Sequence, residues 1–390
     1  MKAFQHIYTS AERGYFPHQG RGFQTVALSS SLVGTEDLKT LERAAFYSVS
    51  AHRRRANDLP VKETFFHLPS GALAAGRIID SGADSMGREG NYLSHHIVFS
   101  KDDFLRSGAN PFALLDALTV ESDLAPRDLP PVEIRVADDS SPRPIDVDSD
   151  FAASLVVAVA DKRDNTALLI GKEAETRNAL RWLISCLARE ERMRMTFSTH
   201  FYECHNLRSL FCVAAVGSRA EAPAQRQDYL IFDFDAGEFP RLAPVSHFSA
   251  WLAESVRAGR WDEIRALNDV LNELRHCDRV GIKPPVGKLA VAALWEKAGP
   301  EAARAIAGDA RLTIEFLKHA PKDLADAILN HGSPSELCGE GEEASQCLSS
   351  LRASASAKAW RTWAERWKAD TLLAHESAGK QPWWRRLRPE

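Results

Sequence analysis

The sequence predicts an α+β fold in which two mixed α/β domains precede an all-helical C-terminal region. Apolar runs of strand length alternate with helical patterns through the first 245 residues. A stretch rich in proline, aspartate and serine at 121–150 divides these patterns and is typical of a linker. Only helical patterns follow residue 246. The predicted domains are therefore 1–120 and 151–245, with the helical region at 246–390.

Capping residues mark the helix starts of the first domain. Thr35, Ser100 and Asn110 each supply a side-chain oxygen just before a helical pattern, where it can accept hydrogen bonds from the first free amides. Pro111 suits the first helical position after Asn110. Strands are expected where branched and aromatic residues lie between turns, at 3–8, 64–68, 76–80 and 92–99. The helix after Thr35 should pack on this sheet.

The second domain has the alternation of helices and strands that is typical of an α/β fold. Its expected elements are a helix from Phe151, a strand at 167–170, a helix at 173–189, and strands at 193–199, 210–216 and 229–234. The helix at 173–189 is amphipathic, because its leucines recur on one face. Helical patterns then continue at 251–258, 261–276 and 286–298.

The composition is that of a folded protein without a strong overall charge. Hydrophobic residues make up 44% of the 390, and the formal net charge is -4. This balance gives no field that attracts nucleic acid, so nucleic acid is not the favoured partner. The N-terminus lacks the apolar core of a signal peptide, and the longest apolar run, 152–160, is too short to span a bilayer. We therefore expect a cytoplasmic protein with no membrane span.

The motifs predict neither a cofactor nor a metal site. Gly171-Lys172 lacks the upstream glycine and the following hydroxyl residue that a phosphate-binding loop requires. The tightest group of metal-ligating residue types is His200, Cys204, His205 and Cys212. Its flanks are typical of a hairpin, in which a four-residue spacing does not place ligands on one face. Structural zinc sites have tighter paired ligands, so we predict no zinc.

Two adjacent histidines lie in the predicted strand at 92–99. Strand alternation places His95 with apolar residues on one face and His96 with Ser94 on the other. A histidine in an apolar file is typical of a core position. Because Ser94 and His96 share a face, they could act as nucleophile and base, but the sequence identifies neither a third group nor oxyanion donors.

A loop containing three glycines precedes this strand. The glycines permit positive backbone angles, and Asp84, Arg88 and Asn91 can hydrogen-bond either the turn itself or a ligand. The sequence allows two interpretations of this loop: a polar turn whose groups bond to one another, or a loop that binds a ligand. The candidate pocket comprises Asp84, Arg88, Asn91, Ser94 and His96. A hydrolase with its site at the glycine loop and His96 is the first alternative function.

Tryptophan is concentrated near the C-terminus. Trp360, Trp363 and Trp367 recur at helical spacing, a stripe that is typical of a packed helix face. The last residues form a tail of tryptophans and arginines: Trp383, Trp384, Arg385, Arg386 and Arg388. Because aromatic and arginine side chains often anchor protein interfaces, this tail is a candidate partner surface. Nucleic-acid binding through the tail is a second alternative function.

Five short motifs follow one another in the first domain. They are Gln5–Ser10, Gly22–Ala27, His67–Gly71, Gly76-Arg77 and Gly87–His96. In number and order these motifs resemble the N-terminal domain of the bacterial GTPase-associated adaptor family. Arg192–Thr199 similarly resembles the signature of the middle domain of that family. The sequence departs from the family at 29–32, where Ser-Ser-Ser-Leu replaces an expected proline and glycine.

The resemblance implies a component that is encoded beside a small GTPase in bacterial signalling or defence systems. The leading hypothesis is a non-catalytic adaptor or scaffold, whose N-terminal sheet domain binds the GTPase or its associated proteins. The lack of a complete catalytic, metal or nucleotide motif also favours a protein that is not an enzyme. The sequence leaves the oligomeric state open.

Overall fold

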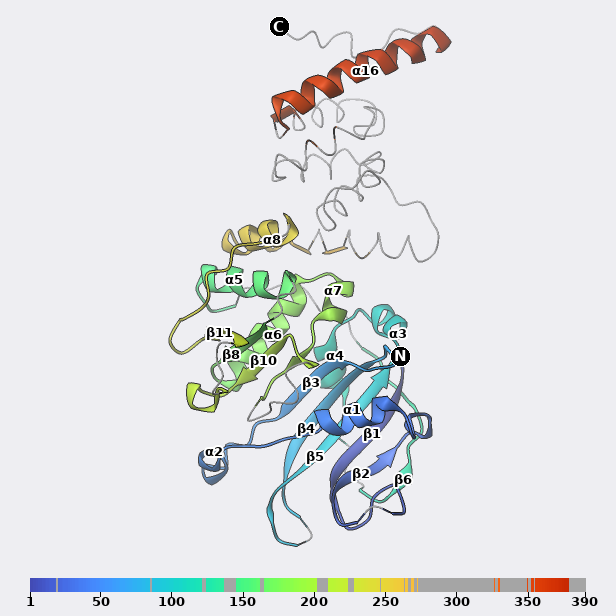
Figure 1. Cartoon of the computed structure of the whole chain (residues 1–390), viewed down its shortest axis with the longest axis vertical. Helices are drawn as coiled ribbons and strands as arrows, with labels where there is room; N and C mark the ends of the chain where they lie inside the picture. The colour runs from blue at the N-terminus through green and yellow to red at the C-terminus, as the bar shows by residue number, and fades with distance from the viewer. Residues whose placement is uncertain are drawn as a thin grey trace. The chain divides into compact units, whose positions relative to one another are not determined.

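The computed structural model describes most of the first 262 residues and a C-terminal helix (Figure 1). The described residues are 1–18, 20–84, 86–120, 124–136, 145–161, 165–201, 210–223, 228–245, 247–262, 264–265, 268–269, 272, 326, 329, 349, 352–353 and 355–378. Two compact units are present, Met1–Val245 with Leu252–Asn268, and Ser246–Trp251 with Asp269–Glu390.

The larger unit is built on an eleven-stranded mixed sheet. Its antiparallel part consists of β1 (Lys2–Ala11), β2 (Gly22–Leu28), β3 (Lys62–His67), β4 (Leu73–Ala83) and β5 (Glu89–Phe99). Its parallel part consists of β8 (Thr166–Ile170), β9 (Phe197–Ser198), β10 (Val213–Val216) and β11 (Tyr229–Asp233). The strand order is β11-β8-β10-β9-β3-β4-β5-β1-β2-β6. The predicted mixed α/β character is confirmed.

β9 joins the two parts of the sheet, because it runs parallel to β10 and antiparallel to β3. The predicted linker also contributes two short strands. β6 (Arg127–Asp128) pairs with β2, and β7 (Val132–Glu133) pairs with β1. That residues 121–150 separate two domains stays a prediction. The strands before and after this segment belong to one sheet.

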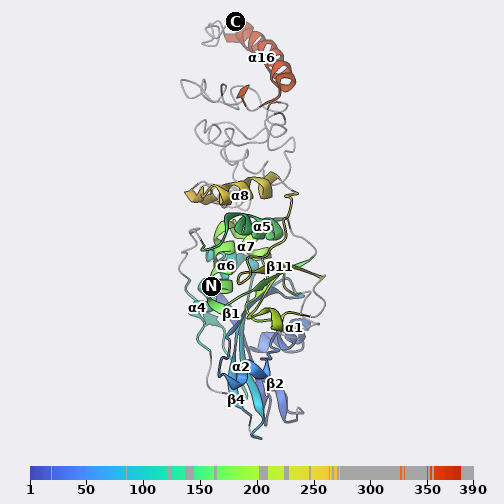
Figure 2. The same cartoon turned by 90° about the vertical axis from the view of Figure 1, so that its left-hand side faces the viewer.

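Helices cover both faces of this sheet. The first part carries a short 3-10 helix at Ser30–Leu32, α1 (Glu36–Ala44), α2 (Ala51–Arg55), α3 (Lys101–Arg106) and α4 (Pro111–Ala117). The second part carries α5 (Ser149–Ala160), α6 (Glu173–Cys186), α7 (Arg189–Arg194) and a short 3-10 helix at Arg219–Glu221. Figure 2 shows α1 and α4 on opposite sides of the sheet.

The predicted caps are confirmed. Thr35 Oγ1 accepts a hydrogen bond from the amide of Leu38 at 3.2 Å, and Ser100 Oγ accepts one from the amide of Asp103 at 3.0 Å. Asn110 caps α4 in the same way. These contacts are local in the chain, which explains why the sequence alone predicted them.

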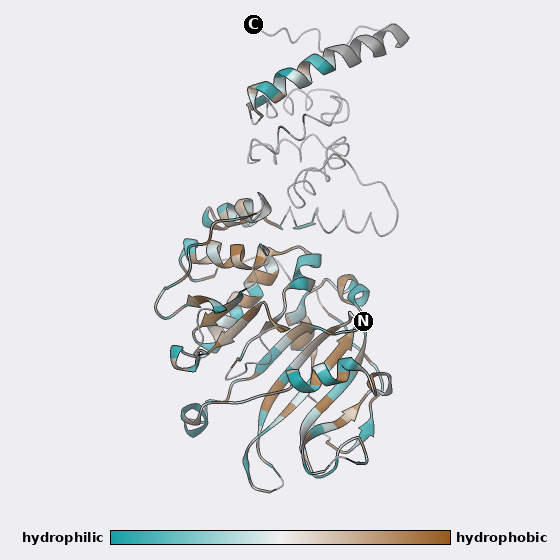
Figure 3. Ribbon diagram, viewed as in Figure 1, coloured by the Kyte–Doolittle hydropathy of each residue, from teal (hydrophilic) through white to brown (hydrophobic). Residues whose placement is uncertain are grey.

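Apolar residues of α1 form the core over one face of the sheet. Leu38 and Leu41 belong to the same cluster as Phe66 and Val98 of the strands. In the second part, α5 is hydrophobic along most of its length (Figure 3), and all its residues from Phe151 to Ala158 are buried. A helix that is apolar all round requires cover on all sides.

Two of the differences from the sequence prediction concern strands. β2 was not expected as a strand, although it pairs with β1 along its length. At 193–199 only two residues form a strand, because Arg189–Arg194 forms α7 instead. Five of the six α7 residues are charged, and they favour a helix with Glu-Arg pairs, such as Arg194 with Glu191 at 2.7 Å.

Beyond residue 245 the described elements are α8 (His247–Arg257) and α16 (Ala357–Ala378). The tryptophan stripe lies on α16. Trp363 is 2% exposed, and its ring centroid lies 5.2 Å from that of Trp360 and 5.3 Å from that of Trp367. The all-helical region as a whole stays a prediction. Within the described residues, no helix is both long and apolar enough to cross a membrane.

Candidate functional site

β5 places the two predicted histidines in the interior of the sheet, between β4 and β1. The register with β1 pairs His96 with His6 and His95 with Ile7. The two side chains therefore lie on opposite faces, as strand alternation predicts. His95 is 3% exposed, and its Nε2 lies 3.2 Å from Gln5 Oε1. It is a core histidine with a polar partner.

His96 is fully enclosed on the face that α1 covers. Its Nδ1 lies 3.0 Å from Ser94 Oγ, and its Nε2 lies 3.5 Å from Thr64 Oγ1. The ring of His6 stacks at a centroid distance of 6.0 Å, and the ring of Phe66 meets it edge-on. The structure thus brings Ser94 and His96 together, but both residues are 0% exposed. A nucleophile and its base require access to a substrate, which this pair lacks.

Gly76 on β4 leaves the space that the His96 ring fills. A Cβ atom at this position would lie 2.1 Å from His96 Cδ2, far inside van der Waals contact. The Gly76-Arg77 motif therefore has a packing reason. The two residues are 20 positions apart and meet only because β4 pairs with β5, so the sequence alone did not connect them.

His6 extends this buried polar row toward α1. Its Nε2 lies 2.9 Å from Thr25 Oγ1, and the Thr25 hydroxyl donates to Glu42 Oε1 at 2.7 Å. Because the Thr25 proton is used on Glu42, His6 donates from Nε2, and its Nδ1 carries no proton. Among the described residues, this Nδ1 has no hydrogen-bond partner.

Burial keeps both rings neutral. Burial, and then the nearby His95, lower the pKa of His6 to about 3. Burial, followed by His6, lowers the pKa of His96 well below its ordinary value. Removing an imidazolium from water is unfavourable unless a countercharge accompanies it. The two histidines of the row are therefore neutral donors and acceptors at pH 7.

The glycine loop between β4 and β5 is a self-contained polar turn. Asp84 Oδ1 accepts hydrogen bonds from the amides of Met86 and Arg88, both at 2.9 Å, and the Arg88 guanidinium approaches Asp84 Oδ2 at 2.7 Å. These bonds to Arg88 and the backbone lower the pKa of Asp84. Gly87 and Gly90 have φ of 75° and 94°, which glycine adopts without strain. These polar groups thus bond to one another and stabilise the conformation of the loop.

Asn91 lies apart from both groups. Its Oδ1 accepts hydrogen bonds from Ser10 N at 3.2 Å and from Thr9 Oγ1 at 3.3 Å, and so ties β5 to β1. The five candidate pocket residues occupy three places: Asp84 and Arg88 at the loop, Asn91 against β1, and Ser94 with His96 beneath α1. They do not converge on one cleft.

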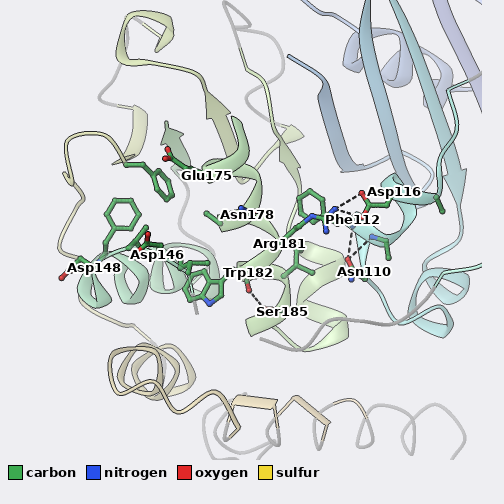
Figure 4. Close-up of a pocket in the computed structure, with 18 of the residues that line it drawn as sticks. Asn110, Phe112, Asp116, Asp146, Asp148, Glu175, Asn178, Arg181, Trp182 and Ser185 are labelled. Carbon is green, nitrogen blue, oxygen red and sulfur yellow. Dashed lines mark hydrogen bonds and ion pairs between the residues drawn. The ribbon is translucent and has the colours of Figure 1, made fainter. Parts of the chain in front are cut away.

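A groove of about 960 Å³ runs along α6 instead (Figure 4). Its walls are α4, α6, the start of α5, residues 145–148 and the chain after β11. Its aromatic lining residues are Phe112, Phe151, Trp182 and Phe234. Its charged lining residues are Asp116, Arg135, Asp146, Asp148, Glu175 and Arg181. Because these residues come from distant segments, sequence reasoning missed the groove; its one local signal was the polar side of the predicted helix at 173–189.

A charged network at one end of the groove joins α6 to β3 and α4. The Glu63 side chain, 2% exposed, accepts hydrogen bonds from Arg177 at 2.7 and 2.9 Å and from Arg77 at 3.2 Å. Asp116 accepts one from Arg177 at 2.9 Å and two from Arg181 at 2.6 and 2.8 Å. Two-pronged arginine–carboxylate pairs fix orientation as well as charge.

The network holds its members in their charged forms. Burial alone would raise the pKa of Asp116, but Arg177 and Arg181 outweigh it and lower that pKa. Burial alone would lower the pKa of Arg177, but Glu63 and Asp116 raise it above its ordinary value. Both guanidinium groups also lie over the ring of Phe112, at 5.3 and 5.2 Å from its centroid.

Of the other residues that the sequence analysis singled out, some are packed in the structure and some lie outside the described residues. His200 Nε2 lies 2.8 Å from the carbonyl oxygen of Ser48, and Cys212 Sγ lies 2.9 Å from that of Thr196. In the part of the chain that the structure describes, no cluster of His, Cys, Asp or Glu could hold a metal. Outside the described residues lie Cys204, His205, Trp383, Trp384, Arg385, Arg386 and Arg388.

Residues 2–134 match the family model of GTPase-associated protein 1, N-terminal domain type 2. The N-terminal part of this chain is a GTPase-associated domain of that type. The resemblance seen in the short motifs is thereby confirmed for this domain, which spans β1 to β7 and includes the buried histidine row. The likeness of Arg192–Thr199 to the middle domain of the family stays a prediction. A comparison with curated proteins finds no match.

Proposed function

We propose that the chain is a non-catalytic adaptor that binds a GTPase, or proteins associated with one, in a cytoplasmic signalling or defence system of a bacterium. The observation that carries this proposal is the GTPase-associated domain at residues 2–134. Its presence indicates association with a GTPase system in general. Beyond this association, we propose the adaptor role, the bacterial context and the cytoplasmic compartment.

The enclosure of Ser94 and His96 supports a binding role over the hydrolase alternative. Both residues are 0% exposed, and the polar atoms of the adjacent loop bond to one another. The motifs of this region therefore stabilise the sheet. A binding protein needs such a rigid support and an accessible surface.

Exposed apolar side chains at one end of the sheet provide such a surface. Phe23 is 44% exposed and stacks on Tyr92 at a centroid distance of 4.3 Å. Met86 is 59% exposed, and its sulfur accepts a hydrogen bond from Arg21 at 3.5 Å. The β1–β2 and β4–β5 loops lie at the same end of the sheet (Figure 1). Exposed aromatic, methionine and arginine side chains are typical of interface cores.

The test is co-precipitation of the full chain with the GTPase encoded beside it, loaded with GDP or with a non-hydrolysable GTP analogue. Binding in at least one nucleotide state is expected. Phe23→Ser combined with Met86→Ser should weaken it about tenfold or more, because exposed anchors carry much of an interface's affinity. Val245→Ser is the matched control, since Val245 is 71% exposed but lies outside the N-terminal domain.

The two parts of the proposal fail separately. If the chain binds the GTPase in neither nucleotide state, the adaptor role is wrong. If the double variant binds as well as the control, the adaptor role stands and the contact surface lies elsewhere.

A further inference from the structure

The groove along α6 has an acidic end. Asp146 and Glu175 are exposed and lie on the side away from the arginine network, together with Asp148 (Figure 4). Asp146 has no ion-pair partner among the described residues. Glu175 Oε2 accepts a hydrogen bond from the Lys172 amide at 3.2 Å, and its Oε1 lies 3.8 Å from Nζ of Lys172, whose side chain is 79% exposed. The carboxylates at this end therefore keep most of their charge available.

Aromatic rings line the groove beside these carboxylates. The partly exposed ring of Phe234 meets the buried ring of Phe151 edge-on at a centroid distance of 4.9 Å, and Trp182, which is also buried, lies farther along α6. Aromatic faces attract guanidinium and ammonium groups, and they also bind aliphatic side chains. Carboxylates together with rings suit a ligand that is both cationic and apolar.

The other end of the groove adds little net charge. Asp116 is neutralised by Arg177 and Arg181, which are themselves held by carboxylates. Arg135 is the remaining cation of the lining, against Asp146, Asp148 and Glu175. The Asp148 carboxylate caps α5 by accepting hydrogen bonds from two amides, but it stays exposed. The free charge of the lining is thus negative.

The length of the groove suits an extended peptide. Its α6 residues run from Glu175 to Ser185, which at 1.5 Å per residue is about 15 Å. An extended chain covers that distance with about four or five residues. A peptide of this length places side chains on the rings and the carboxylates together.

We propose that this groove binds a basic peptide segment of a partner protein. An arginine or lysine of the peptide lies between Asp146 and Glu175, and an apolar side chain packs on Phe234, which is partly exposed. This inference rests on the groove alone and not on the GTPase association. The two sites lie on different segments, so a partner that binds here need not be the GTPase.

The probe is an array of short synthetic peptides in which arginine, leucine and tryptophan are permuted. A second array carries glutamate in place of each arginine. Both arrays are incubated with the full chain, and affinities of the bound peptides are then measured by fluorescence anisotropy. We compare the wild type with Asp146→Asn/Glu175→Gln and with Asp102→Asn, an exposed acidic position on α3 that does not line the groove.

The expected result is selective binding of arginine-containing peptides, which weakens as salt is raised. The double variant should lose about tenfold in affinity, while Asp102→Asn binds like the wild type. Glutamine keeps a side-chain oxygen that can cap α6 as Glu175 does, and neither residue is in the core, so loss of binding will not reflect unfolding. The proposal is overturned if no basic peptide binds, if the glutamate array binds equally, or if the double variant matches the Asp102→Asn control.

Discussion

The two faces of the sheet bury polar groups in opposite ways. Under α1, His6 and His96 are neutral and meet hydroxyl groups. Under α4 and α6, Glu63 remains paired with Arg77 and Arg177 by direct hydrogen bonds. The histidine row carries no charge, and the buried Lys62 on the same face donates to the carbonyl oxygens of Ala44 and Phe46. On the second face the buried charges are paired with one another.

This difference teaches what each face depends on. A neutral network is stable only while its groups stay unprotonated and its rings fit their space. A charged network is stable only while every partner is present, because a single buried ion left alone is strongly unfavourable. The α1 face should therefore respond to pH and shape, and the α6 face to the loss of a charge.

The largest effect is expected on the charged face. Glu63→Ala leaves Arg177 and Arg77 without their shared carboxylate, and should lower the free energy of unfolding by about 4 kcal/mol in urea denaturation. Lys39→Ala is the control, because its pair with Glu36 is exposed on both sides and should contribute less than about 0.5 kcal/mol. Equal effects of the two changes would contradict the comparison.

Acid should act chiefly on the neutral face. The unfolded chain protonates His6 near its ordinary pKa of 6.5, whereas the folded protein does so only near 3. The unfolded state thus binds more protons between these values, so stability is complete above pH 6.5 and decreases as the pH falls. From pH 6.5 to 4.5 the loss from His6 should be about 2 kcal/mol.

The measurement is urea denaturation at several pH values in that window. His96 adds to the slope with the same sign, since its pKa is also lowered. His6→Gln should flatten the pH dependence, whatever its own effect at pH 7. If wild type and variant have parallel profiles, the histidine row is not the source.

A methyl group added at Gly76 tests how closely the His96 ring packs against β4. Gly76→Ala places a Cβ 2.1 Å from His96 Cδ2, and should destabilise the protein by about 2 kcal/mol. Gly20→Ala, with no atom within 4 Å of the added group, should change stability by less than about 0.5 kcal/mol. Gly76→Ala combined with His96→Ala should cost less than the sum of the two changes, because the clash is then removed. Additive costs would show that the ring and the glycine are not coupled.

The smallest effect is expected at the exposed edge of the charged network. Arg181→Ala removes a pair in which the side chains are 39% and 45% exposed, and Asp116 keeps Arg177. The loss should be about 1 kcal/mol, including the contact with the Phe112 ring. Thermal or urea unfolding of this variant beside Glu63→Ala ranks the two positions. A larger effect at Arg181 than at Glu63 would reverse our reading of which carboxylate is buried.

Local patterns could be predicted from the sequence, and contacts between distant segments could not. The caps of α1, α3 and α4 each involve residues within three positions, and all were predicted. The opposite faces of His95 and His96 follow from strand period and were also predicted. The burial of His96 was not, because it depends on α1 and on the neighbouring strands.

The candidate pocket shows the same limit. Asp84, Arg88, Asn91, Ser94 and His96 are close in sequence, but a strand alternates its faces and a hairpin loop stands apart from both. The groove is the converse case, because its lining comes from segments between Asn110 and Gly237 that fold together. The five pocket candidates, close in sequence, therefore lie apart in the structure, whereas the residues that line the groove are distant in sequence and lie together.

The sequence by itself determined the helix starts, the strand periods and the GTPase-associated domain, since each rests on residue types in local order. The tertiary structure alone decided that Ser94 and His96 are enclosed, that Gly76 accommodates a ring, and that Glu63 meets Arg177 across 114 positions. Strand pairing and helix packing bring these groups together, and their protonation and partners depend on that burial.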